Sequence, residues 1–130
     1  MNVLGLSAFA GESAAALIRE GRLAAWAEEA TFSDDEAGVP WRAAAWCLEQ
    51  GEVAGENLDA VALAHKPLLA FDHLVSSGLA DAPAGWQEFS REGQRRLADL
   101  ALAPRLRAAL GVRGPLLYVE RLEALAHAAW

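Results

Sequence analysis

Three histidines and one cysteine are the side chains of this sequence with the clearest capacity for metal binding or nucleophilic chemistry. His65 and His73 are eight residues apart, which on a helix is two turns or about 12 Å, too far for both imidazoles to bind one ion. His127 has no histidine four residues away. Cys47 is the only cysteine and lies in the apolar run AAAWCL, which predicts a buried structural thiol and excludes an internal disulfide. These spacings predict no metal site and no thiol nucleophile.

Arginines gather in the second half of the chain and could contact anions. They are interleaved with acids, in the order Glu88, Arg91, Glu92, Arg95, Arg96, Asp99, Arg105 and Arg107. Such alternation is typical of a solvated helix face with ion pairs at i,i+4 spacing. The net charge of −7 and the pI near 4.9 also argue against nucleic acid as a partner.

The first thirty residues predict three antiparallel strands. Residues 3–9 form a short apolar run that stops at Ala10-Gly11-Glu12, residues 13–19 follow as a second strand, and Glu20-Gly21 gives a hairpin signal before a third strand over 22–30. Because Ala, Leu, Arg and Glu favour helices, one long helix is the competing interpretation. The glycines at hairpin spacing favour the strands.

The rest of the chain alternates helix and strand. We expect a polar loop over 31–38, a helix over 41–50 after Pro40, a buried strand over 58–64, a helix over 67–80, a helical stretch over 86–110 bent or divided at Gly93 or Pro104, a strand over 116–119 and a final helix over 121–130. The predicted order is β-β-β-α-β-α-β-α, in one domain over residues 1–130.

The N-terminus has no basic residue before its apolar stretch, and no apolar run approaches the roughly 18 residues that span a bilayer. We therefore expect a soluble cytoplasmic protein with no membrane partner.

Three antiparallel strands followed by alternating helix and strand are the order of a ribonuclease H-like domain, the half-unit of the actin-like ATPase superfamily. The opening resembles the O-carbamoyltransferase family of nodulation and antibiotic biosynthesis, whose proteins begin N-I/V-L-G-I/L-S-A-F-Y-H-D-S-A-A-A-L. Further matching blocks contain Glu29 with Phe32, Pro40 with Ala43, Cys47 and Leu48, the run Leu58-Asp59-Ala60-Val61, and Lys66-Pro67-Leu68-Leu69 with Phe71.

This resemblance implies a mixed-sheet α/β lobe in a carbamoyl-transfer context. In the family, a carbamoyl adenylate made from carbamoyl phosphate and ATP is consumed at an iron-containing Kae1-like domain, where the carbamoyl group passes to a hydroxyl. The sequence corresponds to the first lobe of that domain, and the resemblance covers nearly the whole chain. One lobe holds half of the usual cleft, so for this chain alone we expect no bound cofactor and at most weak nucleotide binding.

The residues that resemblance assigns to catalysis are changed. Gly11-Glu12 stands where the family has the His-Asp pair that is thought to serve the transfer chemistry, so Glu12 is the one weak catalytic candidate. The family's iron-binding pattern E-H-H-L-S-H aligns with Glu120 to Leu125. Arg121 and Leu125 replace the two ligand histidines, and neither side chain can bind iron.

Three further family positions are altered, and two of the changes remove a positive charge. Thr31 and Asp34 replace the two arginines of the family pattern R-F-S/T-R, and His65 replaces an acid before Lys66-Pro67. A carboxylate at position 34 repels the anions that an arginine would attract. No P-loop of the GxxxxGK[ST] kind is present.

Packing residues thus match the family while chemistry residues do not, which favours a specialised non-catalytic relative. Such a protein would bind a larger carbamoyltransferase-like chain or a copy of itself, with tryptophans Trp26, Trp41, Trp46, Trp86 and Trp130 as candidate anchors. Two alternatives remain: half of a split O-carbamoyltransferase completed by a partner chain, and a truncated fragment of such an enzyme. The acceptor substrate is not predicted.

Overall fold

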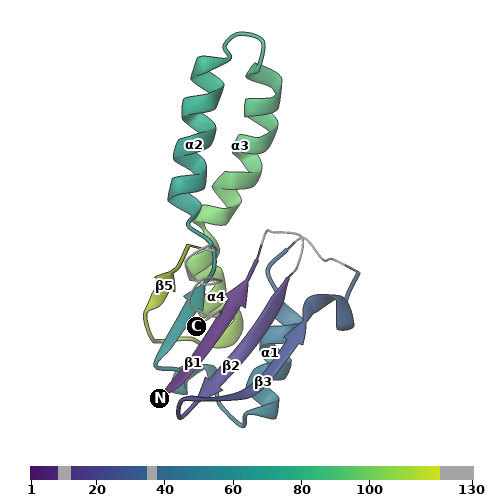
Figure 1. Cartoon of the computed structure of the whole chain (residues 1–130), viewed down its shortest axis with the longest axis vertical. Helices are drawn as coiled ribbons and strands as arrows, with labels where there is room; N and C mark the ends of the chain where they lie inside the picture. The colour runs from purple at the N-terminus through teal and green to yellow at the C-terminus, as the bar shows by residue number, and fades with distance from the viewer. Residues whose placement is uncertain (9–12, 35–37, 121–130) are drawn as a thin grey trace. The chain divides into compact units, whose positions relative to one another are not determined.

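The computed structural model describes residues 1–8, 13–34 and 38–120, and the ribbon in Figure 1 shows these residues in colour. The chain divides into two compact units. The first, the sheet unit, comprises Met1–His65 and the chain from Leu106 onward; the second, the hairpin unit, comprises Lys66–Arg105. The single domain over residues 1–130 stays a prediction.

A five-stranded mixed sheet forms the sheet unit, in the order β3-β2-β1-β4-β5. The strands are β1 (Asn2–Ser7), β2 (Ala14–Arg19), β3 (Arg22–Glu28), β4 (Ala60–Leu63) and β5 (Leu116–Tyr118). The central strand β1 pairs antiparallel with β2 and parallel with β4, and β5 is parallel to β4. This confirms the predicted α/β class and mixed sheet.

The hairpin between β2 and β3 confirms three strands and shows that the single long helix is wrong. Glu20 and Gly21 have φ values of 52° and 77°, the pair of positive values that a two-residue type I′ turn requires. Tertiary pairing overrides the helix propensity of the alanines, because Ala15 and Ala25 lie buried on one face of the sheet while their chain neighbours are less buried.

Several predicted boundaries need correction. The first strand ends at Ser7 instead of residue 9, and the last ends at Tyr118 instead of Val119. The third strand ends at Glu28 instead of Ala30, since a 3-10 turn over Glu29–Thr31 follows it, in which Phe32 donates a backbone hydrogen bond to the Glu29 carbonyl. The fourth strand begins at Ala60 instead of Leu58, after a second 3-10 turn over Gly55–Asn57.

The long C-terminal helical stretch is a further correction, because it divides at Ala101 and neither at Gly93 nor at Pro104. Its two helices are α3 (Trp86–Leu100) and α4 (Leu102–Leu110). Pro104 lies in the first turn of α4. Backbone N–H groups in a first turn make no hydrogen bond within the helix, so the N–H that proline lacks costs α4 nothing there. Gly93 lies inside α3 at a helix-interior cost of about 1 kcal/mol.

The other predicted helices are confirmed as α1 (Trp41–Gln50) and α2 (Pro67–Ala80). The predicted helix over 121–130 lies outside the described residues. In the part of the chain that the structure describes, no helix is long and apolar enough to span a membrane.

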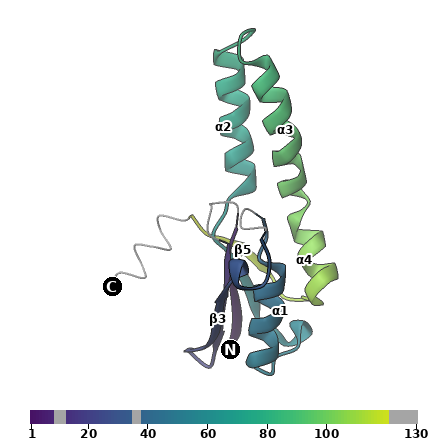
Figure 2. The ribbon, with the colours of Figure 1, turned by 90° about the vertical axis from the view of Figure 1, so that its right-hand side faces the viewer.

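The core of the sheet unit lies between α1 and one face of the sheet, as the side view in Figure 2 shows. Leu4 and Leu17 from the central strands and Ala43 and Cys47 from α1 are fully buried there. Gly51 follows the last residue of α1 and lies directly against the side chain of Leu17. A Cβ at position 51 would overlap that side chain, so a glycine is needed for this close approach. The face of the sheet towards α1 is therefore the packed face.

A buried carboxylate fixes the start of α1. Glu29, only 4% exposed, accepts hydrogen bonds from the backbone N–H groups of Arg42 at 3.2 Å and Ala43 at 2.8 Å. These N–H groups belong to the first helical turn, which has no acceptors of its own, and Pro40 offers no side-chain cap. Glu29 therefore acts as a remote N-cap that joins the end of β3 to α1.

Glu29→Ala is expected to lower the free energy of unfolding by about 2–3 kcal/mol, because it leaves two N–H groups of the α1 start without their charged acceptor. Urea denaturation followed by circular dichroism measures this loss. Glu49→Ala, at an exposed position of the same helix, is the control and should change stability by less than about 0.5 kcal/mol. Equal effects from the two variants would contradict the capping role.

Candidate functional site

The residues that the family resemblance singled out for catalysis and metal binding lie outside the described residues. These are Glu12, Arg121 and Leu125. The same holds for Gly11 and His127. Their assignments therefore remain predictions from the sequence.

Cys47 is a buried structural thiol, as predicted. It is fully inaccessible to solvent, and its Sγ lies 3.5 Å from the carbonyl oxygen of Ala15. Burial raises the pKa of the Cys47 thiol above its ordinary value of 9.0, and a backbone hydrogen bond from Ala27 partly opposes this shift. A neutral, enclosed thiol is a poor nucleophile.

Two of the histidines fall in separate units. His65 follows β4 in the sheet unit, whereas His73 lies within α2 of the hairpin unit. Among the described residues, no group of three or more His, Cys, Asp or Glu side chains could hold a metal ion. The described chain thus offers no candidate metal centre.

The interleaved charges of α3 form ion pairs along the helix, as the sequence pattern predicts. Arg96 lies 2.9 Å from Glu92 and 3.9 Å from Asp99, at i,i+4 and i,i+3 spacing. These groups are partly exposed, so each pair contributes only a few tenths of a kcal/mol. Arg96 therefore lies on a solvated face of α3.

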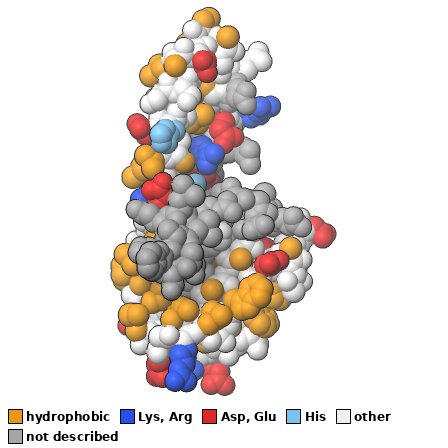
Figure 3. All heavy atoms as spheres, in the orientation of Figure 1, with side chains coloured by type: hydrophobic (Ala, Val, Ile, Leu, Met, Phe, Trp, Pro, Cys, Tyr) orange, Lys and Arg blue, Asp and Glu red, His pale blue; other side chains and the backbone are white. Residues whose placement is uncertain are grey.

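The face of the sheet that points away from α1 is mostly apolar. Strand alternation places on it Val3, Gly5 and Ser7 of β1, Ala14, Ala16 and Ile18 of β2, Leu23, Trp26 and the exposed Glu28 of β3, Ala60 and Ala62 of β4, and Leu117 of β5. We call this surface the open face. The space-filling view in Figure 3 shows hydrophobic side chains gathered on it.

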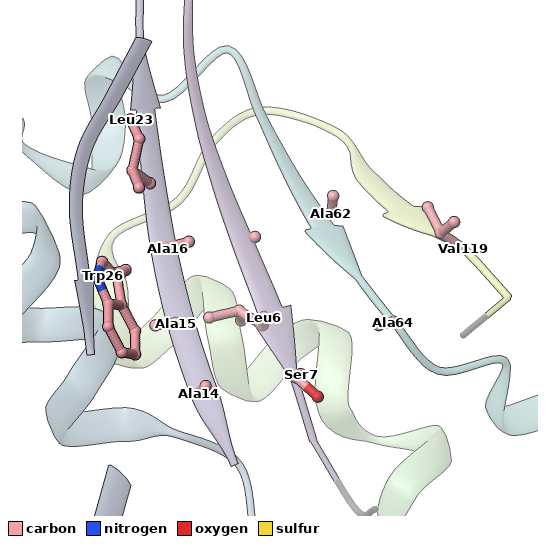
Figure 4. A pocket seen from close by; sticks show the side chains of 11 residues that line it. Leu6, Ser7, Ala14, Ala15, Ala16, Leu23, Trp26, Ala62, Ala64 and Val119 are labelled. Atoms are coloured by element: carbon pink, nitrogen blue, oxygen red, sulfur yellow. The ribbon is translucent and has the colours of Figure 1, made fainter. Parts of the chain in front are cut away.

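A hollow of about 540 Å³ occupies the open face. The close view in Figure 4 shows Leu23 and Trp26 along one side and Val119 along the other, with small side chains such as Ala16 and Ala62 between them. Because glycine and alanine keep the floor low, the hollow is a shallow trough across β1, β2 and β4. An apolar side chain or helix could approach the backbone closely there.

The lining of the hollow limits its chemistry. Ser7 supplies the one polar side chain among the lining residues, and none of them carries a charge. Acid-base catalysis and the binding of phosphate need charged or strongly polar groups, which this lining does not provide. The hollow can remove the apolar surface of a ligand or of a protein segment from water.

The tryptophans proposed as anchors differ in exposure. Trp26 on the open face and Trp86 at the start of α3 are each 59% exposed, while Trp41 and Trp46 are half-buried on α1. Trp46 packs against Phe32 with ring centroids 6.0 Å apart. Trp26 and Trp86 are therefore the more exposed tryptophans of the described residues, and Trp130 lies outside those residues.

Sequence reasoning noted Glu29 only as a family match and missed its cap, because a cap twelve residues ahead of the helix leaves no local spacing signal. It also missed the open face as a unit. The alternation within each strand signals two different faces, but the sequence does not say which of two apolar faces a helix covers.

Comparison with known proteins identifies the fold of the chain and does not identify an activity. No family model matches the chain. The uncharacterized protein sll1178 of Synechocystis is 32% identical to this chain over 90 residues. The matched region is 68% of this chain and 15% of sll1178. The chain therefore corresponds to a small part of that protein.

Two solved structures share the fold at 20% sequence identity. They are YeaZ from Pseudomonas aeruginosa and an uncharacterized protein with similarity to peptidase YeaZ from the same organism, each with a TM-score of 0.53 over 98% of this chain. The match covers 47% of either structure. The fold is thus an actin-like ATPase lobe of the ribonuclease H-like type, as predicted, and the chain spans about half the length of these structures.

The raised pKa of Cys47 makes stability depend on pH. Above pH 9.0 the thiol of the unfolded chain loses its proton while the folded thiol keeps it, so the free energy of unfolding falls as pH rises through this range. Urea titrations between pH 8 and 10.5 should show this fall, and Cys47→Ala should flatten it. An identical slope in the variant would contradict the assignment.

Proposed function

We propose that the chain is a non-catalytic lobe of a carbamoyl-transfer system, which binds a larger carbamoyltransferase-like protein through the open face. The observation that carries this proposal is the apolar hollow between Trp26 and Val119. Its lining has no charged group, and its floor of small residues suits an inserted apolar segment.

The energetics of the open face support a protein partner. Leu23 and Trp26 are both 59% exposed and stand side by side at the edge of the hollow. Covering a large apolar side chain contributes about 1.5–3 kcal/mol, and exposed aromatic anchors are typical of binding hot spots. A contiguous apolar surface of this kind is more often an interaction site than a plain exterior.

The choice of partner rests on the family resemblance. Five sequence blocks of the O-carbamoyltransferase pattern occur in order, while Gly11, Arg121 and Leu125 stand where its catalytic and iron-binding residues would be. The similar protein sll1178 is several times longer than the matched region. A larger chain of this type has the remaining lobe and the chemistry that these residues lack.

The first prediction from this proposal concerns partner capture. A tagged form of the full chain, expressed in its native cells, should retain a larger carbamoyltransferase-like protein identified by mass spectrometry. Trp26→Glu combined with Leu23→Glu should abolish capture, because two charges would then be buried in the hollow. Leu79→Glu, an exposed leucine of the hairpin unit, is the matched control and should retain the partner.

Three results would contradict docking on the open face. They are recovery of no carbamoyltransferase-like chain, capture that survives both open-face charges, and loss of capture in the hairpin-unit control alone. Circular dichroism of each variant ensures that a lost partner reflects a changed surface. Because both open-face side chains are largely exposed, their replacement should leave the fold intact.

The second prediction separates a binding lobe from half of a split enzyme. The test applies if the partner transfers carbamoyl groups in the reconstituted complex. In a non-catalytic lobe the Glu12 carboxylate takes no part in the reaction, so Glu12→Ala should change the rate of carbamoyl transfer by less than about twofold. A general base contributes about 10²–10⁴-fold, so a loss of that size would favour the split O-carbamoyltransferase. Glu12→Gln, which keeps the side-chain shape, distinguishes a lost base from a disturbed turn.

A further inference from the structure

Strand β3 forms one edge of the five-stranded sheet, as Figure 1 shows, and β2 is its one partner among the described strands. At seven residues β3 is longer than β5 at the other edge, which has three. The outer N–H and C=O groups of an edge strand have no partner within the sheet, so they can pair with a strand of another chain. What the β3 edge binds depends on which backbone groups and side chains it presents.

The N–H and C=O groups of Trp26 and Glu28 point away from β2. Glu29 donates its N–H to the carbonyl oxygen of Ser13, the residue before β2, at 2.7 Å. The pairing of the two strands is regular from Ala25 to Glu28. Residues that bond the neighbouring strand alternate with residues that do not, so Trp26 and Glu28 direct their backbone groups outward. The edge thus offers two N–H and two C=O groups to an added strand.

On the open face, this edge favours a basic side chain. Trp26 and Glu28 both lie on that face by strand alternation, and both are exposed. An indole ring attracts a cation over its face, and a carboxylate attracts a cation placed opposite it on a neighbouring strand. A residue opposite Trp26 or Glu28 on an added strand is therefore favoured when it carries a positive charge.

The side of the edge that faces α1 favours an apolar side chain. A pocket of about 420 Å³ adjoins the strand, and we call it the edge pocket. Its lining comprises Trp26, Ala27, Glu28, Thr31, Phe32 and Trp46. Phe32 and Trp46 pack together with ring centroids 6.0 Å apart. Arg42 donates a hydrogen bond to the Phe32 carbonyl oxygen at 2.6 Å, so a second cation here would be repelled. An apolar residue opposite Ala27 would instead bury its side chain against the rings.

We propose that the β3 edge binds an extended segment of another protein, in antiparallel orientation, whose residues alternate between basic and apolar. The backbone of the segment pairs with Trp26 and Glu28, its basic side chains lie beside these two residues, and an apolar side chain enters the edge pocket. A second copy of the chain does not meet this requirement, because its own β3 has Trp26 and Glu28 where the added strand needs basic residues. The proposal does not rest on a carbamoyltransferase-like partner.

Isothermal titration calorimetry of the full chain with the acetylated and amidated heptapeptide KVKFKVK tests the proposal. We expect a dissociation constant below about 1 mM, as for a short strand with few backbone hydrogen bonds. N-methylation of the two inner lysines removes N–H groups that would face β3 and should weaken binding at least about tenfold. N-methylation of the two valines, whose N–H groups would face solvent, is the matched control and should leave the dissociation constant within about threefold.

Glu28→Lys should also weaken binding of the unmethylated peptide at least about tenfold, because lysine would then face lysine across the two strands. Asp72→Lys makes the same charge change at an exposed residue of the hairpin unit. This control separates a local contact from the general attraction between a basic peptide and a chain of net charge −7. Circular dichroism confirms that each variant is folded.

Three results would overturn the proposal. They are no binding of the peptide at about 1 mM, equal binding of the two N-methylated peptides, and equal weakening by Glu28→Lys and Asp72→Lys. Binding that does not depend on the position of the methyl groups would mean that the peptide uses its side chains alone and adds no strand to β3.

Discussion

The buried carboxylate of Glu29 is the contact on which the packing of the sheet unit depends. It accepts hydrogen bonds from Arg42 and Ala43 and so fixes where α1 begins relative to the end of β3. From that point α1 packs along β2 and β3, over Leu17, and covers this part of one face of the sheet. Because a sheet has two faces and α1 packs on one, the same contact also determines on which side of the sheet the open face lies.

Two surfaces of this architecture expose large apolar side chains, and they differ in composition. The open face is a shallow trough whose floor consists of small side chains between Trp26 and Val119, so it accepts something that projects into it. On the hairpin unit, the exposed Leu68 and Leu79 share one stripe of α2 with the exposed Asp72, so this surface mixes apolar and charged side chains.

Two of the side chains with a capacity for chemistry have structural contacts in the described residues. Cys47 is enclosed, and Arg96 of α3 forms ion pairs along its helix. The lining of the hollow has no charged side chain. What the sequence keeps from the O-carbamoyltransferase pattern are residues that build strands and helix starts, such as Pro40 and Leu48, which pack in the described core.

The sequence by itself determined the order of the strands along the chain, the hairpin at Glu20-Gly21 and the ranges of α1 and α2, because turn glycines, helix-start prolines and strand alternation are local signals. It predicted the break before α4 at the wrong residue, because tertiary packing decides where a long helical stretch is interrupted. Only the tertiary structure showed the order of the strands within the sheet, the cap by Glu29 and the face on which α1 packs. Each of these joins residues far apart in the chain, and no periodicity within one element contains that information.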